Sequence, residues 1–520
     1  MDQPYISNHR AFTQKSFTAS RREEFKTNAT GTGQSSYFKP KFNWQKNKIS
    51  SIHALDRYQS QQSSLTFANQ SQILNTSKFY KIISDSTHWT NLSRRMDAIR
   101  NTSTTRPFQD VLRLIQENAG SSDIFLLHLF LRDLPDNDKH LFQTKVFPEM
   151  AKLVLKTPTL FPKEIAMMTQ GRAGAVSLTR EQCACLLSHM FMCTTLRQSS
   201  SALPMRYNFS QLYSSTRQGQ GEKYQVKKQK IACLLNYFAR VTTSSSDSKE
   251  MVTFSRVHLD ETVHGRCDLD AWAQLPETLK EVEIDTTRKI EDYHNSAEVD
   301  FANKHLGGGV LGAGAVQEEI QFITRPEQIV GLLFCESMTD KEAILIKGAK
   351  IYSGYKGYAS TFAYDPLSIF SQCDVDGGSE REVIAIDAQD YSNFHPRAQY
   401  GKEEILRELN KAYVGFSGDL TTKKVIATGS WGCGSFQGDA QLKFLLQWMA
   451  ATRAGRDMKY SSFGKADISG FQRIVKTYTG QKVGKLMQDI LTGCVLMSHT
   501  SKGLFEILLD NMNHSKYRHL

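Results

Sequence analysis

Apolar residues recur at helical spacing from about residue 107 to about residue 245. Five segments show this spacing: 108–119, 123–134, 141–156, 178–193 and 229–241. Side chains three or four positions apart gather on one face of an α-helix, which predicts amphipathic helices here. Thr179 opens the sequence Thr-Arg-Glu-Gln, which predicts a capping box at the start of the fourth helix. We therefore expect residues 106–245 to form a helical accessory domain.

The pattern changes after a Ser- and Thr-rich loop at 242–250. Short apolar runs, which indicate buried strands, lie at 251–259, 343–349, 382–388 and 423–429. Amphipathic segments, which indicate helices, lie at 326–337, 402–416, 438–454 and 484–494. Strands that alternate with helices are typical of three-layer α/β domains. We expect residues 246–520 to form one.

Residues 1–105 show no sustained apolar period and are rich in Ser, Gln, Asn, Thr and Lys. Such a segment buries too little apolar surface to offset its ordering entropy, so we expect it to be disordered. It also carries the basic excess of the chain: residues 1–100 hold 15 Lys and Arg against 6 Asp and Glu, and the remainder holds 49 against 47. The excess suits contact with a polyanion such as nucleic acid or with an acidic partner, and equally suits a solvated targeting or regulatory tail.

Composition places the chain among ordinary globular proteins, with 40% apolar and 22% charged residues. No run of 18 apolar residues and no apolar signal region is visible, so we expect an intracellular protein without membrane association. The nine cysteines are odd in number and scattered, which favours a reducing compartment. Cys183, Cys185, His189 and Cys193 lack the paired spacing of metal ligands, and we favour small core residues of a helix there.

A glycine-rich segment followed by two glutamates lies at 299–322. Its sequence is VDFANKHLGGGVLGAGAVQEEIQF, with glycines at Gly307, Gly308, Gly309, Gly312 and Gly314. Glycine lets the backbone approach a ligand closely, and consecutive amides in such a loop form a concave anion site. Glu318 and Glu319 follow at once. The pattern predicts a phosphate cradle beside an acid, which suits a substrate whose phosphate positions a reactive bond near a carboxyl group.

A second glycine-rich loop lies at 427–439, with the sequence ATGSWGCGSFQGD. It follows an apolar strand and precedes a long amphipathic helix, an arrangement that binds phosphate in many proteins. Two such loops suit a pyrophosphate held from both sides. Tyr352, Tyr355 and Tyr358, in YSGYKGYAST, are either ligand-stacking aromatics or ordinary core and surface residues.

Glu318 and Glu319 are expected to have different roles, because adjacent residues do not share a face of a helix or a strand. A glycosidase acid needs a raised pKa, which burial beside a second carboxyl group would supply. The alternative is that the two acids simply occupy the solvated first turn of a helix, where negative charge is favourable.

Gly307–Gly309, seven further residues and Gln317-Glu318-Glu319 together resemble the GGG-x(6–8)-QEE signature of poly(ADP-ribose) glycohydrolases. Three further segments resemble the family in the same order: VDFAN before the signature, then YSGYKGYAST, then ATGSWGCGSFQGDAQLK. Segments 178–193 and 230–241 resemble the family's helical accessory region, and the whole resemblance covers residues 107–510. It implies a macrodomain, an ADP-ribose-binding α/β/α fold, as the catalytic domain.

The resemblance implies that Glu319 is the general acid, that Glu318 holds ribose hydroxyls, and that Asp300 and Asn303 support the catalytic loop and contact the distal ribose. Ile290 and Glu291 would recognise adenine, Phe463 would stack on it, and Phe436 would press the terminal ribose into place. The remaining implied ligand contacts are Gly307, Gly308, Gly309, Gln317, Tyr358, Ser430, Trp431, Gly432, Cys433, Gly434 and Ser435. Ser430 stands where the family often has Asn, which leaves one polar contact open.

The implied reaction is hydrolysis of the ribose–ribose O-glycosidic bonds of poly(ADP-ribose) attached to proteins, with release of ADP-ribose. Protonated Glu319 would donate to the leaving oxygen, an oxocarbenium-like state would form, and the same carboxylate would then activate water. The resemblance implies no metal or redox cofactor. We expect a monomer in the nucleus, the cytoplasm or both, with a role in the response to DNA damage.

Two other readings remain at this stage. A macrodomain that binds ADP-ribose without cutting it would need the phosphate loops but no acid, so Glu319 argues against it. A nucleotide-dependent oxidoreductase is suggested by Gly307, Gly309 and Gly312, which spell G-x-G-x-x-G. Such a motif should follow a strand directly and lead to an acid at the end of a second strand, whereas HNSAE before VDFAN resembles a loop and the region 327–336 resembles a helix.

Overall fold

An eight-stranded mixed sheet forms the centre of the computed structural model, which describes residues 78–517 except 102–106, 121, 198–200, 204–206, 216–220, 244–247, 367–380, 419–423 and 463–467. The strand order is β3-β4-β7-β10-β6-β11-β12-β5. Strands β10, β6, β11, β12 and β5 run parallel, and β3, β4 and β7 are antiparallel at one end. Their bounds are β3 Gly174–Thr179, β4 Met251–His258, β5 Val282–Asp285, β6 Ser296–Ala302, β7 Glu342–Lys347, β10 Glu382–Asp387, β11 Val425–Gly429 and β12 Met458–Ser461.

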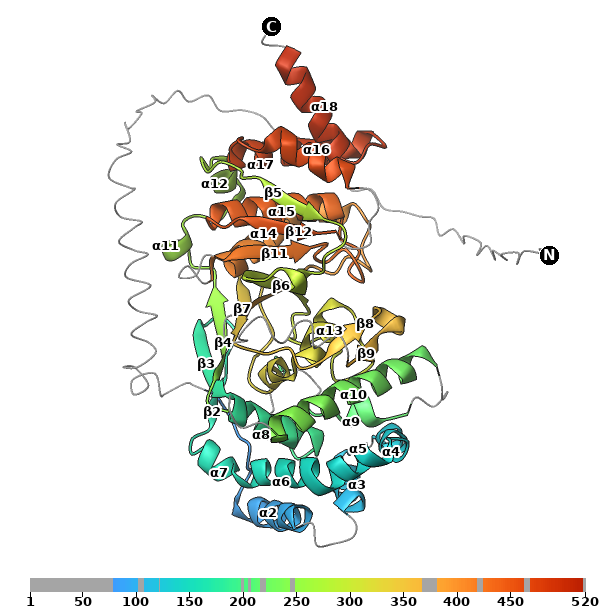
Figure 1. Ribbon diagram of the computed structural model, residues 1–520. Helices are drawn as coiled ribbons and strands as arrows, with labels where there is room; N and C mark the ends of the chain where they lie inside the picture. The colour runs from blue at the N-terminus through green and yellow to red at the C-terminus, as the bar shows by residue number, and fades with distance from the viewer. Residues whose placement is uncertain are drawn as a thin grey trace, which may run out of the picture. The chain divides into compact units, whose positions relative to one another are not determined.

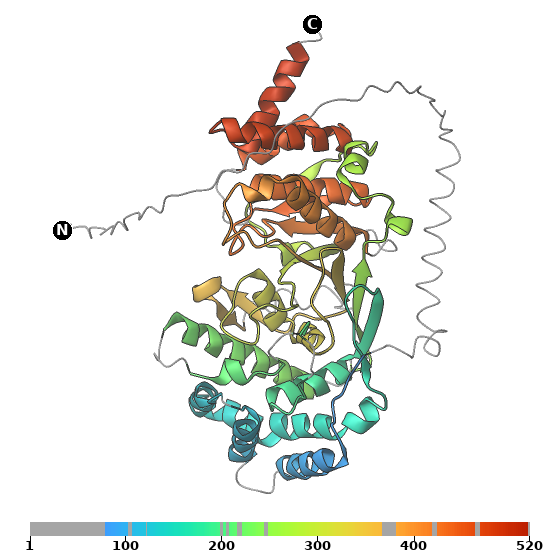
Figure 2. The same ribbon diagram turned by 180° about the vertical axis from the view of Figure 1, so that it is seen from behind.

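Helices cover both faces of this sheet (Figures 1 and 2). In β10, Val383 and Ala385 point into one apolar core, and Ile384 and Ile386 point into the other. Such alternation is expected of a strand that is buried on both faces. One core contains α14 (Lys402–Ser417), α15 (Ala440–Arg453) and α17 (Val483–Leu496), and the other contains α8 (Arg180–Phe191) and α10 (Glu222–Thr243). The predicted α/β fold with an N-terminal helical part is confirmed.

The predicted helices of the accessory region are present. They are α3 (Pro107–Asn118), α4 (Phe125–Arg132), the π-helical segment Phe142–Val146 with α6 (Phe147–Leu155), α8 and α10. Thr179 caps α8 through the predicted capping box with Gln182. Cys183, Cys185 and His189 are buried in this part of the protein, and His189 contacts the hydroxyls of Thr157 and Thr194 at 2.9 Å each. Burial lowers the pKa of His189 to about 3.

The helical region and the sheet are not separated as predicted. Strand β3 lies within 106–245, yet it forms the edge of the large sheet by pairing with β4 along its whole length. A boundary at residue 245 would cut this pairing. The apolar residues of β3 are only Val176 and Leu178 on its buried face, which leaves too short a pattern to identify it from sequence.

The prediction that residues 1–105 are disordered is wrong for residues 78–101. Helix α2 spans Ser86–Arg100, and the side chain of Asp85 accepts a hydrogen bond from the amide of His88 at its start. Leu92, Met96 and Ile99 are buried at spacings of four and three, but the polar residues between them obscure the period. The prediction for residues 1–77 lies outside the described residues.

Strand β6 lies between β10 and β11 in the sheet and was not predicted from sequence. The residues HNSAE were predicted to form a loop, although β6 begins at Ser296. The apolar run is interrupted by two buried acids, Glu298 and Asp300. Glu298 is matched by Arg325 and Arg381, each with a nitrogen 2.7 Å from it. Segment 326–337, predicted as a helix, forms a 3₁₀ helix over Pro326–Leu333. The oxidoreductase pattern still fails, because the described residues 327–336, where its second acid should end a strand, contain this 3₁₀ helix and no strand of the sheet.

Candidate active site

A cavity of about 1360 Å³ opens where the parallel strands β6 and β11 separate. Their pairing ends at Ala427 and Glu298, although β6 continues to Ala302. The carboxyl ends of diverging parallel strands are a common place for ligands in α/β proteins. The cavity wall brings together most of the site predicted from sequence: Ile290, Glu291, Asn303, Gly308, Gly309, Gln317, Glu318, Glu319, Tyr358 and the loop from Ser430 to Phe436.

Gln317 closes the gap between the two strands. Its side-chain amide donates to the carbonyl of Val299 (3.1 Å), and its oxygen accepts from the amide of Phe301 (2.8 Å). These are the backbone groups that β11 leaves unpaired when it diverges from β6. Gln317 lines the cavity, but its polar atoms bind β6, so its role is first to hold α13 (Gln317–Thr324) against the strand.

The first glycine loop binds the two glutamates of α13. Glu318 accepts hydrogen bonds from the amides of Gly307 (2.6 Å) and Asn303 (2.9 Å). Glu319 accepts from the amides of Gly309 (2.8 Å) and Val316 (3.0 Å). The amides of Gly307 and Gly309 thus hold carboxyl groups of the protein itself and are not open to a phosphate. The loop positions the acids, and a phosphate contact of its remaining amides stays a prediction.

The two carboxyl groups meet at Gly308. A Cβ atom built on Gly308 would lie 2.5 Å from Glu318 Oε2 and 2.8 Å from Glu319 Oε1. Gly308 also has a φ of +49°, a backbone conformation that other residues rarely adopt. Both glutamates are nearly buried, at 3% and 7% exposure, so they are not a solvated first turn of a helix. Adjacent residues converge here because the loop folds over the start of α13.

Asp300 lies behind this pair and does not line the cavity. It is fully buried, and neither carboxyl oxygen has a hydrogen-bond partner among the described residues. Its predicted contact with the distal ribose is therefore not supported by its position. Burial raises the pKa of Asp300 well above its ordinary value, the Glu319 carboxyl raises it further, and Arg325 opposes the shift. Burial also raises the pKa of Glu318, together with the Asp300 and Glu319 carboxyls and against the amides of Asn303 and Gly307.

Replacing Asp300 by Asn is expected to stabilise the protein, and increasingly so as pH rises. The unfolded chain releases the Asp300 proton near pH 4, whereas the folded chain keeps it to a higher pH. Between these two pKa values the folded state binds more protons, so its stability falls as pH rises. Asn removes this loss. Thermal unfolding should show a midpoint at least about 2 °C above wild type at pH 8, and no gain at pH 4. A gain that does not depend on pH would contradict the raised pKa.

The second glycine loop presents a run of free backbone amides to the cavity. The amides of Gly434, Ser435 and Phe436 donate no hydrogen bond within the described part of the chain, and all three residues line the cavity. Helix α15 begins just beyond, with Asp439 as its cap. Free backbone amides beside a helix start attract phosphate. Ser430 bonds to the hydroxyl of Tyr460 at 3.3 Å, so the residue that departs from the family pattern is engaged with the fold.

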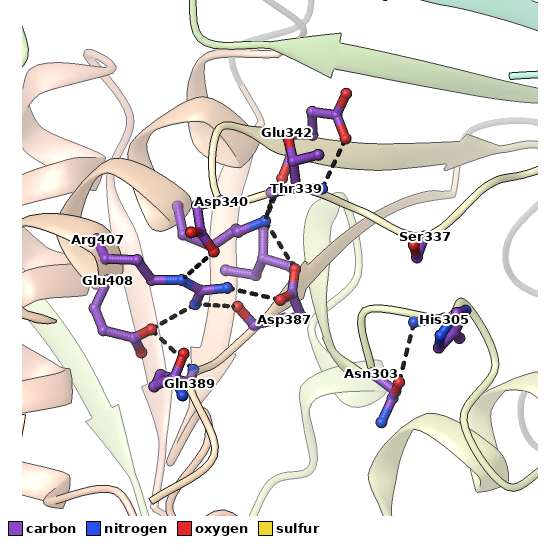
Figure 3. A network of polar contacts seen from close by, with 12 residues as sticks. Asn303, His305, Ser337, Thr339, Asp340, Glu342, Asp387, Gln389, Arg407 and Glu408 are labelled. Carbon is purple, nitrogen blue, oxygen red and sulfur yellow. Dashed lines mark hydrogen bonds and ion pairs between the residues drawn. The ribbon is translucent and has the colours of Figure 1, made fainter. Parts of the chain in front are cut away.

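A network of charged residues, in which Asp387 and Glu408 are buried, lies at the segment that leaves β10 (Figure 3). Arg407 lies between Asp340, Asp387 and Glu408, with contacts of 2.9, 2.7 and 2.5 Å. Glu408 also accepts from the amide of Gln389 at 2.9 Å. Its other oxygen pairs with Lys443, a fully buried lysine. The network thus fixes the segment that leaves β10.

The loop rests on that segment. The indole of Trp431 is buried, donates to the carbonyl of Ile386 (3.0 Å) and lies under the ammonium of Lys443, 4.2 Å from its ring centre. A Cβ atom on Gly432 would lie 2.4 Å from the Cβ of Ala388, so the chain approaches too closely for a side chain. Cys433 is partly exposed on the cavity wall. These contacts hold the loop against the end of β10 and the segment that follows it, and the free amides of the loop face the cavity.

The cavity wall also contains Ile290 and Glu291, which lie in a 3₁₀ turn, Ile290–Asp292. Tyr355 donates a hydrogen bond to Glu291, and the ammonium of Lys289 lies 3.8 Å from the centre of the Tyr355 ring. The three tyrosines thus differ. Tyr352 is a core residue bonded to Glu327 (2.6 Å), Tyr355 holds Glu291, and Tyr358 is half exposed over the cavity.

Sequence reasoning did not single out Arg325. This arginine is buried beside the cavity, and its charge acts on Asp300. A single Arg before Pro326 carries no sequence signal of such a role. Phe463, predicted to stack on adenine, lies outside the described residues. No helix in the described ranges is long and apolar enough to cross a bilayer.

Two domain models of one known family match the chain. The helical domain precedes the macro domain along the sequence, as in the fold described above. The helical domain of poly(ADP-ribose) glycohydrolase (PARG) matches residues 134–256. The macro-domain fold of the same family matches residues 269–470. The second match contains both glycine loops and the glutamate pair.

Individual proteins match over longer stretches. Poly(ADP-ribose) glycohydrolase 1 of Caenorhabditis elegans is 33% identical over 336 residues, which cover 62% of this chain and 40% of that protein. Probable poly(ADP-ribose) glycohydrolase 2 of Arabidopsis thaliana is 29% identical, over 72% of this chain and 82% of that protein. Poly(ADP-ribose) glycohydrolase 2 of C. elegans is 30% identical, over 70% of this chain and 73% of that protein. The chain thus spans less than half of the first relative and most of the other two. It belongs to the poly(ADP-ribose) glycohydrolase family and is a glycosidase.

Proposed function

We propose that the chain hydrolyses ribose–ribose O-glycosidic bonds of poly(ADP-ribose) attached to proteins and releases ADP-ribose, with Glu319 as general acid and then base. The observation that carries this proposal is the meeting of Glu318 and Glu319 at Gly308 on the cavity wall, with the free amides of the second glycine loop on the same cavity. A protein that only bound ADP-ribose would need the second feature and not the first.

The carboxyl cluster supplies the proton. Burial raises the pKa values of Asp300 and Glu318 well above their ordinary range, so these two acids favour the protonated form beside the cavity. Glu319 is the more exposed glutamate, at 7% against 3% for Glu318. It is also the residue that the family signature aligns with the general acid. We assign the transfer to Glu319 and the orientation of ribose hydroxyls to Glu318.

In the proposed reaction, the proton of Glu319 passes to the 2′-oxygen of the leaving ribose as the bond from that oxygen to the anomeric carbon breaks. The terminal ribose becomes oxocarbenium-like, and its charge is offset in part by the substrate phosphates. Water then attacks the anomeric carbon and gives a proton to the Glu319 carboxylate, which restores the acid. The diphosphate binds the amides of Gly434, Ser435 and Phe436, and the Phe436 ring presses on the terminal ribose.

The basic N-terminal segment is proposed to bring the enzyme to polyanions, whether poly(ADP-ribose) itself, nucleic acid or an acidic partner. Residues 1–77 carry 10 Lys and Arg against 4 Asp and Glu. We propose a monomer that acts in the nucleus or the cytoplasm in the response to DNA damage. Deleting residues 1–77 leaves α2 intact and should weaken polymer binding in a salt-dependent way, with kcat retained.

The proposed function is tested by incubating the purified chain with labelled poly(ADP-ribose) and separating the products. Free ADP-ribose should accumulate. The same preparation should bind ADP-ribose in a calorimeter, which shows that the cavity is competent. If the protein binds ADP-ribose and releases none from the polymer, the proposed substrate is wrong.

A further inference from the structure

A lysine of the helical domain reaches into the catalytic loop. Lys230 lies on α10, is fully buried, and its Nζ contacts three backbone carbonyls of the first glycine loop. The distances are 3.1 Å to Val310, 3.1 Å to Gly312 and 3.3 Å to Gly309. An ammonium group has three N–H donors, and each of the three oxygens is within reach of one. Buried charge is stable only with such partners.

The same loop contacts the acids through its amides. The amide of Gly309 donates to Glu319 at 2.8 Å, and the amide of Gly307 donates to Glu318 at 2.6 Å. The loop is therefore held on one side through carbonyls and on the other through amides. Gly309 joins the two sides, because its carbonyl accepts from Lys230 and its own amide donates to Glu319.

Helix α10 also binds the segment 352–364, which contains Tyr352, Tyr355 and Tyr358. The side chain of Asn236 donates to the carbonyl of Tyr352 at 2.6 Å, and that of Gln229 accepts from the amide of Tyr364 at 3.0 Å. One helix thus bonds to two separate segments that line or support the cavity. This arrangement differs from a helix that only covers the back of the sheet.

We infer that Lys230 is a positioning residue of the reaction, through which the helical domain sets the glycine loop and, by way of the Gly309 amide, the Glu319 carboxyl. This inference rests on the proposed function. Without the ammonium, three neighbouring carbonyls lose their shared partner, and the loop relaxes away from the geometry that Glu319 requires. Binding of the terminal ADP-ribose depends on the second loop and should change little.

The test compares Lys230→Met with Lys227→Met. Lys227 lies one turn earlier on α10, is 7% exposed, and its Nζ donates to the carbonyls of Gln211 (2.6 Å) and Ser214 (3.0 Å), away from the cavity. The two variants remove the same buried ammonium from the same helix. Lys230→Met should lower kcat for polymer hydrolysis by about 100-fold, the cost of misplacing a catalytic group by about 1 Å, with KM and the ADP-ribose Kd nearly unchanged. Lys227→Met should keep the wild-type kcat at temperatures where both variants are folded.

Equal losses of kcat in the two variants would overturn the inference, as would wild-type kcat in Lys230→Met. If Lys230→Met yields no folded protein, Lys230→Gln replaces it, since an amide offers two donors for three carbonyls and should lower kcat by about 3- to 30-fold. Wild-type kcat in that variant would also overturn it. Inactive wild-type protein would instead reject the proposed function, so the two failures are distinct.

Discussion

Replacing Glu319 by Gln is expected to lower kcat for poly(ADP-ribose) hydrolysis by about 10²- to 10⁴-fold, the usual contribution of a positioned general acid. Gln has nearly the same shape, and its oxygen still accepts from the amide of Gly309, which now donates to Glu319 at 2.8 Å. The variant should therefore bind ADP-ribose with nearly wild-type affinity. Initial rates with labelled polymer and calorimetry with ADP-ribose measure the two quantities on one preparation.

Glu318→Gln is the matched comparison, because the two acids are adjacent and similarly buried. A residue that orients ribose hydroxyls contributes to ground-state binding, so this variant should raise KM as well as lower kcat. If Glu318→Gln instead reproduced the loss expected of Glu319→Gln, with KM unchanged, and Glu319→Gln remained active, the two roles would have to be exchanged.

Replacing Gly308 by Ala is expected to lower kcat by about 100-fold or more, since a displacement of about 1 Å is enough for such a loss. The added Cβ would lie 2.5 Å from Glu318 Oε2 and 2.8 Å from Glu319 Oε1, so at least one carboxyl must move. ADP-ribose should still bind through the second glycine loop. Steady-state kinetics and the Kd of ADP-ribose test this expectation.

Gly120→Ala is the control for the backbone. Gly120 has a φ of +65°, in the same left-handed region as the +49° of Gly308, but nothing lies within 4 Å of its added Cβ. Both variants carry the conformational cost of a left-handed alanine, about 1–2 kcal/mol, and only Gly308→Ala displaces the acids. Comparable thermal midpoints with very different kcat values are expected. Wild-type kcat in Gly308→Ala would mean that the carboxyl positions are not critical.

Helices and strands could be predicted from the sequence where an element buries one face only or buries all of its residues. Amphipathic helices such as α10 and α15 and apolar strands such as β7 and β10 have the expected periods. Strand β6 was not predictable, because Glu298 and Asp300 interrupt its apolar run and are matched only by charges distant in sequence, such as Arg325 and Arg381. A local pattern cannot show that a buried acid has a partner elsewhere.

The same limit applies to the site. The sequence located both glycine loops and the glutamate pair, and the cavity contains them. It could not show that the first loop binds Glu318 and Glu319 while the second keeps free amides for a ligand, because both loops are rich in glycine. The burial of Lys230 against the first loop could not be predicted either, since a lysine in an amphipathic helix usually faces solvent.

The central claim is that Glu319 protonates the leaving oxygen, and a change of leaving group tests it most directly. The test substrate is an ADP-ribose derivative that carries 4-nitrophenol on the anomeric carbon of the terminal ribose. Its leaving group departs as a stable phenolate and needs little protonation. The rates of wild type and Glu319→Gln should be compared on this substrate and on the polymer. The loss caused by Glu319→Gln should be at least about tenfold smaller on the aryl substrate than on the polymer, because only the polymer requires the acid. Equal losses on both substrates would contradict general-acid catalysis by Glu319.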